Sequence, residues 1–139
     1  MKRALRTGAA LAAILCVGLV MTGPASADTT CPSGKSCLWQ DSGFVTNNLT
    51  HNRLQFEFYI PQFSEWNYSG TNIHAENSAS SVHNNGNVES AFFYTGNYEG
   101  GAVFQLPRGE TEGDLSNDTG WAPSGFNDDL QSGYFSSYR

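Results

Sequence analysis

The sequence contains no apolar run long enough to cross a membrane, and it has little positive charge. Its longest apolar stretch covers residues 8–20, which is shorter than the roughly 20 residues that a membrane-spanning helix needs. Seven Lys and Arg residues face 13 Asp and Glu residues, and after residue 6 the basic side chains are Lys35, Arg53, Arg108 and Arg139. So few basic residues do not make a surface that attracts phosphates, which argues against nucleic acid as a partner.

The segment 1–27 has the composition of a secretory signal. Three basic residues among the first six precede the apolar stretch, and Ala25-Ser26-Ala27 follows it, as in signal peptides that are removed on export. We therefore expect residues 1–27 to be cleaved and residues 28–139 to be secreted, extracellular and free of the membrane. A mature chain of that length suits one domain. Its 13 acidic and four basic side chains give a formal net charge of −9, which suits solubility and favours cations.

Cysteine is scarce, and its placement indicates a structural role. Of three cysteines, only Cys31 and Cys37 lie beyond the predicted signal, in the segment CPSGKSC. An isolated pair in an exported chain is expected to form a disulfide. Redox-active pairs normally have two intervening residues instead of five, and such a pair alone is a poor metal site. We therefore predict a structural disulfide.

Helical periodicity is also missing beyond residue 28, and short strand-like runs take its place. Gly, Asn, Ser or Pro separates runs rich in Phe, Tyr, Val and Leu, a pattern typical of an all-β sandwich or barrel. Residues 53–58 alternate between polar and apolar, which predicts a strand with one buried face. Asn85-Gly86 is a tight-turn signal. The runs are Cys37–Gln40, Arg53–Phe58, Ser80–His83, Ala91–Tyr94, Ala102–Leu106 and Tyr134–Tyr138.

Two motifs occur twice in the same order. Trp39 and Phe44 are five residues apart in WQDSGF, and Phe93 and Tyr98 repeat that spacing in FYTGNY. This match aligns Trp39 with Phe93. The hexapeptide ENSASS, residues 76–81, recurs in a similar form as NDDLQS, residues 127–132. Because both matches fall in the same order, we predict a duplicated unit in which an aromatic hairpin precedes a polar, serine-containing turn.

An aromatic hairpin followed by such a turn resembles the βγ-crystallin Greek-key signature. The start CPSGKSCLWQDSGF, the segment NSASSVHNN and the Gly100-Gly101 hairpin resemble secreted actinobacterial proteins grouped with the streptomycete metalloproteinase inhibitor. This resemblance implies two Greek keys packed as a sandwich, about residues 31–86 and 87–139. It also implies a peptidase inhibitor that binds an extracellular protease. The alternative is a calcium-binding or structural extracellular module without inhibitory activity.

The βγ-crystallin resemblance implies one possible cofactor, calcium, at the two polar turns. In calcium-binding members, acidic or amide side chains and a fifth-position Ser or Thr supply oxygens, which are the ligands that calcium prefers. Gln131 departs from Ser or Thr at that place. The alternative is that the turns only satisfy their own backbone, with Ser81 and Ser132 tying the hairpins. The candidate ligands are Glu76, Asn77, Ser80, Asn127, Asp128 and Gln131.

An inhibitor of this kind would present a rigid exposed loop to the protease. In the resembled family a second disulfide braces that loop, but no cysteine follows Cys37 here. The most loop-like segment is residues 108–124, which is acidic and broken by Gly and Pro. Its Trp121 could contact a partner, since Trp often anchors interfaces. Alternatively, Trp121 closes the core.

The catalytic signatures sought in the sequence are absent. There is no H-E-x-x-H zinc motif and no G-x-S-x-G nucleophile motif, and His51, His74 and His83 lack the spacing of a zinc cluster. Acidic pairs such as Asp128-Asp129 occur by chance in a chain with 13 carboxylates. We therefore expect a monomeric protein that is not an enzyme.

Overall fold

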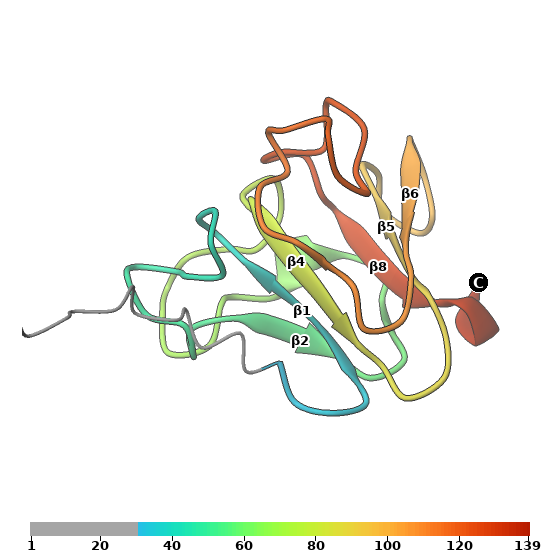
Figure 1. Cartoon of the computed structure of the whole chain (residues 1–139). Coiled ribbons are helices and arrows are strands. Elements are labelled where there is room, and N and C mark those ends of the chain that lie inside the picture. Colours follow the sequence, from blue (N-terminus) through green and yellow to red (C-terminus); the bar gives the residue numbers. More distant parts are fainter. Residues whose placement is uncertain (1–30) are drawn as a thin grey trace, which may run out of the picture.

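The computed structural model describes residues 31–139, so the predicted signal at 1–27 lies outside the described residues. The regular elements in this part of the chain are eight short β-strands and two 3-10 helices, joined by turns and loops (Figure 1). The strands are β1 (Lys35–Trp39), β2 (Leu54–Phe56), β3 (Tyr59–Ile60), β4 (Ser81–Asn85), β5 (Ala91–Tyr94), β6 (Val103–Leu106), β7 (Thr111–Glu112) and β8 (Ser132–Phe135). The helices are η1 (Phe63–Glu65) and η2 (Ser136–Tyr138).

The strands form two antiparallel four-stranded sheets with matching order. One sheet has the order β2-β1-β4-β7 and the other β3-β8-β5-β6. In each half of the chain, the first, second and fourth strands share a sheet, whereas the third strand crosses to the other sheet. These are two Greek keys that exchange their third strands, so the prediction of an all-β sandwich of two Greek keys is confirmed.

Strand register shows how the two halves correspond, and it corrects the predicted aromatic repeat. Trp39 lies opposite Ser81 in the first key, and Tyr94 lies opposite Ser132 in the second. Trp39 therefore corresponds to Tyr94 and not to Phe93. The predicted alignment was wrong by one position here, because the β5 sequence offers two adjacent aromatic residues. The predicted alignment of Ser81 with Ser132 holds.

The core lies between the two sheets, and phenylalanine is its commonest residue. Phe56 of β2 makes edge-on contacts with Phe93 of β5 and Phe135 of β8, with ring centroids 6.0 and 5.5 Å apart. Phe104 stacks on Phe93 and meets Phe126 edge-on. All five rings are buried. Burying one such side chain stabilises a fold by about 1.5–3 kcal/mol, so these five rings contribute substantially to the stability of the sandwich. The contacts of Phe56 join the two sheets.

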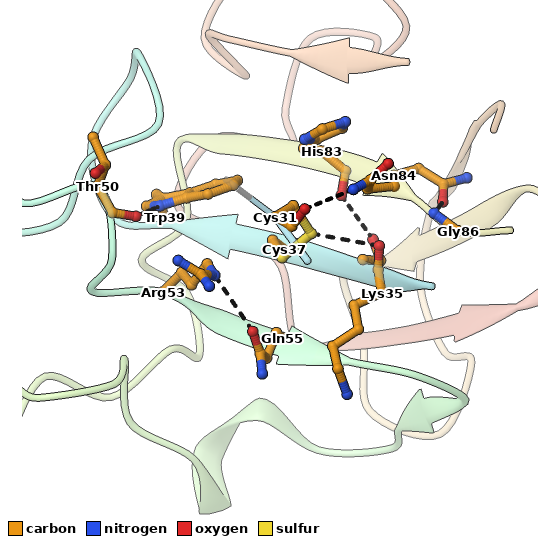
Figure 2. Close-up of a disulfide and its surroundings, with 12 residues drawn as sticks. Cys31, Lys35, Cys37, Trp39, Thr50, Arg53, Gln55, His83, Asn84 and Gly86 are labelled. Carbon is orange, nitrogen blue, oxygen red and sulfur yellow. Dashed lines mark hydrogen bonds between the residues drawn. A yellow bond between two sulfur atoms is a disulfide. The ribbon is translucent and has the colours of Figure 1, made fainter. Parts of the chain in front are cut away.

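A smaller cluster surrounds the disulfide. Cys31 and Cys37 are bonded, with their Cα atoms 5.7 Å apart, which confirms the predicted pairing. Trp39 packs beside them, and its indole N–H donates to the carbonyl oxygen of Thr50 at 2.7 Å (Figure 2). The ring of Phe44 meets the Trp39 ring edge-on. The disulfide thus ties the start of the described chain to β1.

Two local predictions differ from the structure. The alternation at residues 53–58 ends at Phe56, and Phe58 is half exposed because the chain bends there to carry β3 into the other sheet. Asn85-Gly86 does not form the predicted tight turn: β4 continues to Asn85, and the next strand, β5, belongs to the other sheet. Gly86 is required for another reason: a Cβ at this position would lie 2.6 Å from a ring carbon of Phe135.

The connection between the two keys is organised by a buried amide, Asn84. Its Nδ2 donates to the carbonyl oxygens of Glu89 and Leu106, at 3.0 and 2.9 Å, and its Oδ1 accepts the N–H of Gly86 at 2.9 Å. Asn84 belongs to the first key, whereas Leu106 belongs to the second. Because the side chain is fully buried, these three hydrogen bonds satisfy its polar atoms and join the two keys.

We predict that Asn84→Ala lowers the free energy of unfolding by about 3 kcal/mol, because it removes three hydrogen bonds and leaves their backbone partners without the Asn84 amide. The melting temperature should fall by on the order of 10 °C. Thermal unfolding followed by circular dichroism measures this. The control is Asn72→Ala, which changes an exposed asparagine. Equal melting temperatures for the two variants would contradict the role assigned to Asn84.

Candidate functional site

The two polar turns that repeat in the sequence meet in space. The N–H of Asn77 donates to the carbonyl oxygen of Leu130 at 2.9 Å, and the N–H of Asp128 donates to that of Ala79 at 3.0 Å. Asn77 corresponds to Asp128 and Ala79 to Leu130 when Ser81 is aligned with Ser132. Each turn therefore satisfies its backbone through its counterpart in the other key, and the six candidate ligands lie on two paired turns.

The local backbone explains why Asn and Asp occupy these turns. Asn77 and Asp128 both adopt the left-handed conformation, with φ of 51° and 54°. Most side chains avoid this region, whereas Asn and Asp tolerate it because their short polar groups bond locally. Part of the polar signature is thus dictated by backbone conformation. It does not by itself indicate a ligand.

A polar hollow of about 290 Å³ lies beside the paired turns. Ser80, from the first turn, and Asn127, from the second, both line it. Ser80 Oγ donates to Asp128 Oδ1 at 3.3 Å, and Asn127 Nδ2 donates to Asp128 Oδ2 at 2.7 Å. The other four candidate ligands, Glu76, Asn77, Asp128 and Gln131, do not line the hollow. The lining residues are Asp41, Ser42, Ser80, Asp114, Ser116 and Asn127.

Four of these lining residues were not foreseen in the sequence. Asp41 and Ser42 belong to the first hairpin, and Asp114 and Ser116 belong to the connection after β7. Backbone hydrogen bonds hold these segments in place. The N–H of Leu115 donates to the carbonyl oxygen of Ser80 at 2.9 Å, and the N–H of Gly43 donates to the carbonyl oxygen of Gly113 at 2.8 Å. Asp41 could have been found in the sequence, because it is an acidic residue that follows Trp39, the last residue of β1, by two positions. The crossing of β7, which brings in Asp114, leaves no local signature.

The electrostatics of the hollow are negative. Side-chain and backbone hydrogen bonds from Ser116 hold the pKa of the Asp114 carboxyl below its usual range, so it is ionised at neutral pH. Burial raises the pKa of the Tyr68 phenol well above its usual range, and the charges of Asp128 and Asp41 add to that rise, against a hydrogen bond from Ser78. The carboxylates of Asp41 and Asp114 line the hollow and present negative charge to it, which suits a cation.

The serines that follow each turn have a structural function. Ser81 Oγ donates to the carbonyl oxygen of Asp41, and Ser132 Oγ donates to that of Gly96, both at 2.7 Å. Ser81 Oγ also accepts the N–H of Phe44 at 3.1 Å. Both serines are fully buried. They fasten the preceding hairpin in each key, as the structural interpretation of the turns predicts.

Residues 108–124 are partly anchored, although the sequence suggests one long exposed loop. They contain β7, and Leu115 and Ala122 are buried in the core. Glu112 Oε2 accepts the N–H of Trp121 at 2.6 Å, which fixes the backbone at that point. The Trp121 side chain is 46% exposed, so the alternative in which it closes the core is wrong. A contact between Trp121 and a partner stays a prediction.

Within residues 31–139, no group of three or more His, Cys, Asp or Glu side chains is placed to hold a metal ion. A cation at the hollow would therefore depend on hydroxyl, amide, carbonyl and water oxygens in addition to carboxylates. The same residues include no helix that is both long and apolar enough to cross a membrane.

Solved structures with the same arrangement identify the fold. A structure described under the evolution of the eye-lens βγ-crystallin domain fold has a TM-score of 0.57 and 19% identity, covering 76% of this chain and 88% of that one. A βγ-crystallin from Ciona intestinalis has a TM-score of 0.52 and 18% identity, covering 73% and 99%. The fold is that of a βγ-crystallin. A βγ-crystallin from an archaeon has a TM-score of 0.51 and 12% identity, covering 75% of this chain and 99% of that one.

This βγ-crystallin fold confirms part of the expected resemblance. No protein-family model matches the chain. No curated protein matches it either. Nothing in these comparisons supports membership of a peptidase inhibitor family, so inhibition of a protease stays a prediction from the resemblance. Because the sequence identities are so low, the neighbours establish the fold and leave the activity open.

We predict that Ser81→Ala lowers the free energy of unfolding by about 2 kcal/mol and Ser132→Ala by about 1 kcal/mol, because Ser81 makes two buried hydrogen bonds and Ser132 makes one. Urea unfolding measures both. The losses should be the same in calcium and in chelator, since these hydroxyls bond backbone groups. A loss that appears only in calcium would contradict the structural role.

Proposed function

We propose that residues 28–139 act outside the cell as a stable βγ-crystallin-type module without catalytic activity, and that calcium binding at the hollow beside Ser80 strengthens it. One observation carries this proposal: the reciprocal hydrogen bonds between the two polar turns bring Ser80 and Asn127 to a single negative hollow. The predicted secretory signal and the single disulfide support an extracellular location.

The chemistry of the hollow fits calcium. Calcium takes six to eight oxygen ligands, and it accepts carboxylates, amide oxygens, hydroxyls, carbonyls and water in flexible geometry. Asp41 and Asp114 would supply carboxylate oxygens, Asn127 an amide oxygen and Ser80 a hydroxyl. Magnesium fits less well, because it demands a near-ideal octahedron.

The donor set also indicates the affinity. Two carboxylates line the hollow, and a third, Asp128, lies beside it. Sites with few charged ligands are weak, and extracellular calcium modules bind with a Kd of about 10⁻⁴–10⁻³ M. The extracellular role fits such a site, because calcium there is abundant. Binding would join the first hairpin, both turns and the connection after β7, and would thereby oppose separation of the two keys.

We predict that calcium in excess raises the melting temperature relative to chelator by on the order of 5–10 °C, because a ligand in about hundredfold excess over its Kd adds about 2.7 kcal/mol to the free energy of unfolding. Magnesium at equal ionic strength should give a much smaller rise. Calorimetry of residues 28–139 in the three solutions measures this. Identical melting curves in all three would leave the turns as structural caps only.

Variants separate a bound ion from general screening of negative charge. Ser80→Ala and Asp114→Asn should each remove most of the calcium-specific rise. Asp129→Asn is the matched control, because it removes one exposed acidic charge within the second turn from a residue that does not line the hollow. Gln131→Ser introduces the fifth-position serine of the resembled signature, and a larger calcium-specific rise in this variant would identify that position as a ligand. If Asp129→Asn lowers the rise as much as Asp114→Asn, calcium acts by screening and the site is wrong.

A further inference from the structure

A groove on the first Greek key shares no lining residue with the polar hollow. It encloses about 410 Å³, which is within the range of small-molecule sites. Its lining combines the indole of Trp66 with the polar side chains of His51, Arg53, Gln55, Asn67 and Ser69. Gln55 points away from the core, because its neighbours Leu54 and Phe56 are buried while Gln55 is exposed. The groove therefore opens on the outer face of β2.

Trp66 offers this groove a large aromatic surface on a fixed backbone. Its side chain is 49% exposed, so part of the indole is accessible to a ligand. The backbone N–H of Trp66 donates to the carbonyl oxygen of Phe63, and the carbonyl oxygen of Trp66 accepts the N–H of Ala75, both at 3.0 Å. Asn67, the next residue, pairs with His74 in an isolated β-bridge. The ring is therefore presented by an ordered segment, which lowers the entropic cost of binding.

The groove is lined by one permanently cationic side chain, that of Arg53. None of its described lining residues is Asp or Glu. Residues 28–139 otherwise carry 13 carboxylates and only three other basic side chains. Arg53 Nε donates to Gln55 Oε1 at 3.4 Å, and both side chains lie together at the β2 edge (Figure 2). A basic side chain therefore distinguishes this groove from the acidic polar hollow, and a guanidinium is the side chain that best recognises an anionic group.

We propose that this groove binds a pyranose sugar that carries a carboxylate. The C–H face of a sugar ring fits the electron-rich face of an indole, so the ring would stack on Trp66. The guanidinium of Arg53 suits a carboxylate, with which it forms two parallel hydrogen bonds. The amides of Gln55 and Asn67 can donate to and accept from ring hydroxyls. The polar lining disfavours a wholly apolar ligand.

The experiment titrates ¹⁵N-labelled residues 28–139, which contain the whole two-sheet sandwich, with methyl β-D-glucuronide. Methyl β-D-glucoside is the uncharged counterpart, and acetate presents the carboxylate without the ring. Each tryptophan gives its own indole N–H signal. With the glucuronide, the Trp66 indole and the side-chain amides of Gln55 and Asn67 should shift saturably, whereas the indoles of Trp39 and Trp121 should not. The glucoside should bind at least about tenfold more weakly.

The variants use a matched tryptophan. Trp66→Ala should abolish binding, whereas Trp121→Ala, which removes an indole that is similarly exposed at 46%, should leave the Kd unchanged. Trp66→Phe retains a ring and should keep part of the affinity. Arg53→Gln should weaken glucuronide binding by about tenfold and leave glucoside binding unchanged. An unchanged signal of the buried Trp39 indole verifies that each variant is folded.

Three results would overturn the proposal. One is the absence of a saturable Trp66 shift up to about 50 mM glucuronide, well above the millimolar Kd expected of a single sugar ring. Another is acetate shifting the same signals with the same Kd, which would make the groove a general anion site. The third is equal binding of glucoside and glucuronide that Arg53→Gln does not change, which would remove the carboxylate from the recognition.

Discussion

Each sheet of this protein is completed by a strand from the other half of the chain, and the rest of the structure depends on that exchange. β3 pairs with β8 of the second key, and β7 pairs with β4 of the first. Neither key alone has a four-stranded sheet or a covered core, because the phenylalanine cluster draws rings from both. Separating the keys would expose two sheet edges together with this apolar surface. The two halves are therefore expected to fold as one unit.

The polar hollow is a consequence of the same exchange. The crossing of β7 carries Asp114 and Ser116 to the first key, where they meet Ser80 and the first hairpin. The paired turns add Asn127 from the second key. A cation bound there would contact both keys, so it would stabilise the arrangement that the strand exchange creates. The groove at Trp66 differs in this respect, because all its lining residues come from the first key.

The fold was largely predictable from the sequence, because hydrophobic alternation and the duplicated motifs are local patterns. The candidate site was predictable only in part. Ser80, Asn127 and Asp128 were found because the turn motif is contiguous, whereas Asp41 and Asp114 are far apart in the sequence and meet only through strand exchange. The Phe93 alignment failed because β5 has two adjacent aromatic residues. Trp66 gave no signal, since sequence alone does not separate an exposed indole from a buried one.

Native-state hydrogen exchange tests the dependence of the two keys on each other most directly. The amides of Leu38 in β1 and Phe93 in β5 lie in buried strands of different keys. If strand exchange makes the sandwich one cooperative unit, both amides should report the same opening free energy, equal to that of global unfolding, and the same dependence on denaturant. An opening free energy for one key that is lower by about 2 kcal/mol or more, with a smaller denaturant slope, would show that the keys unfold separately and would contradict this account.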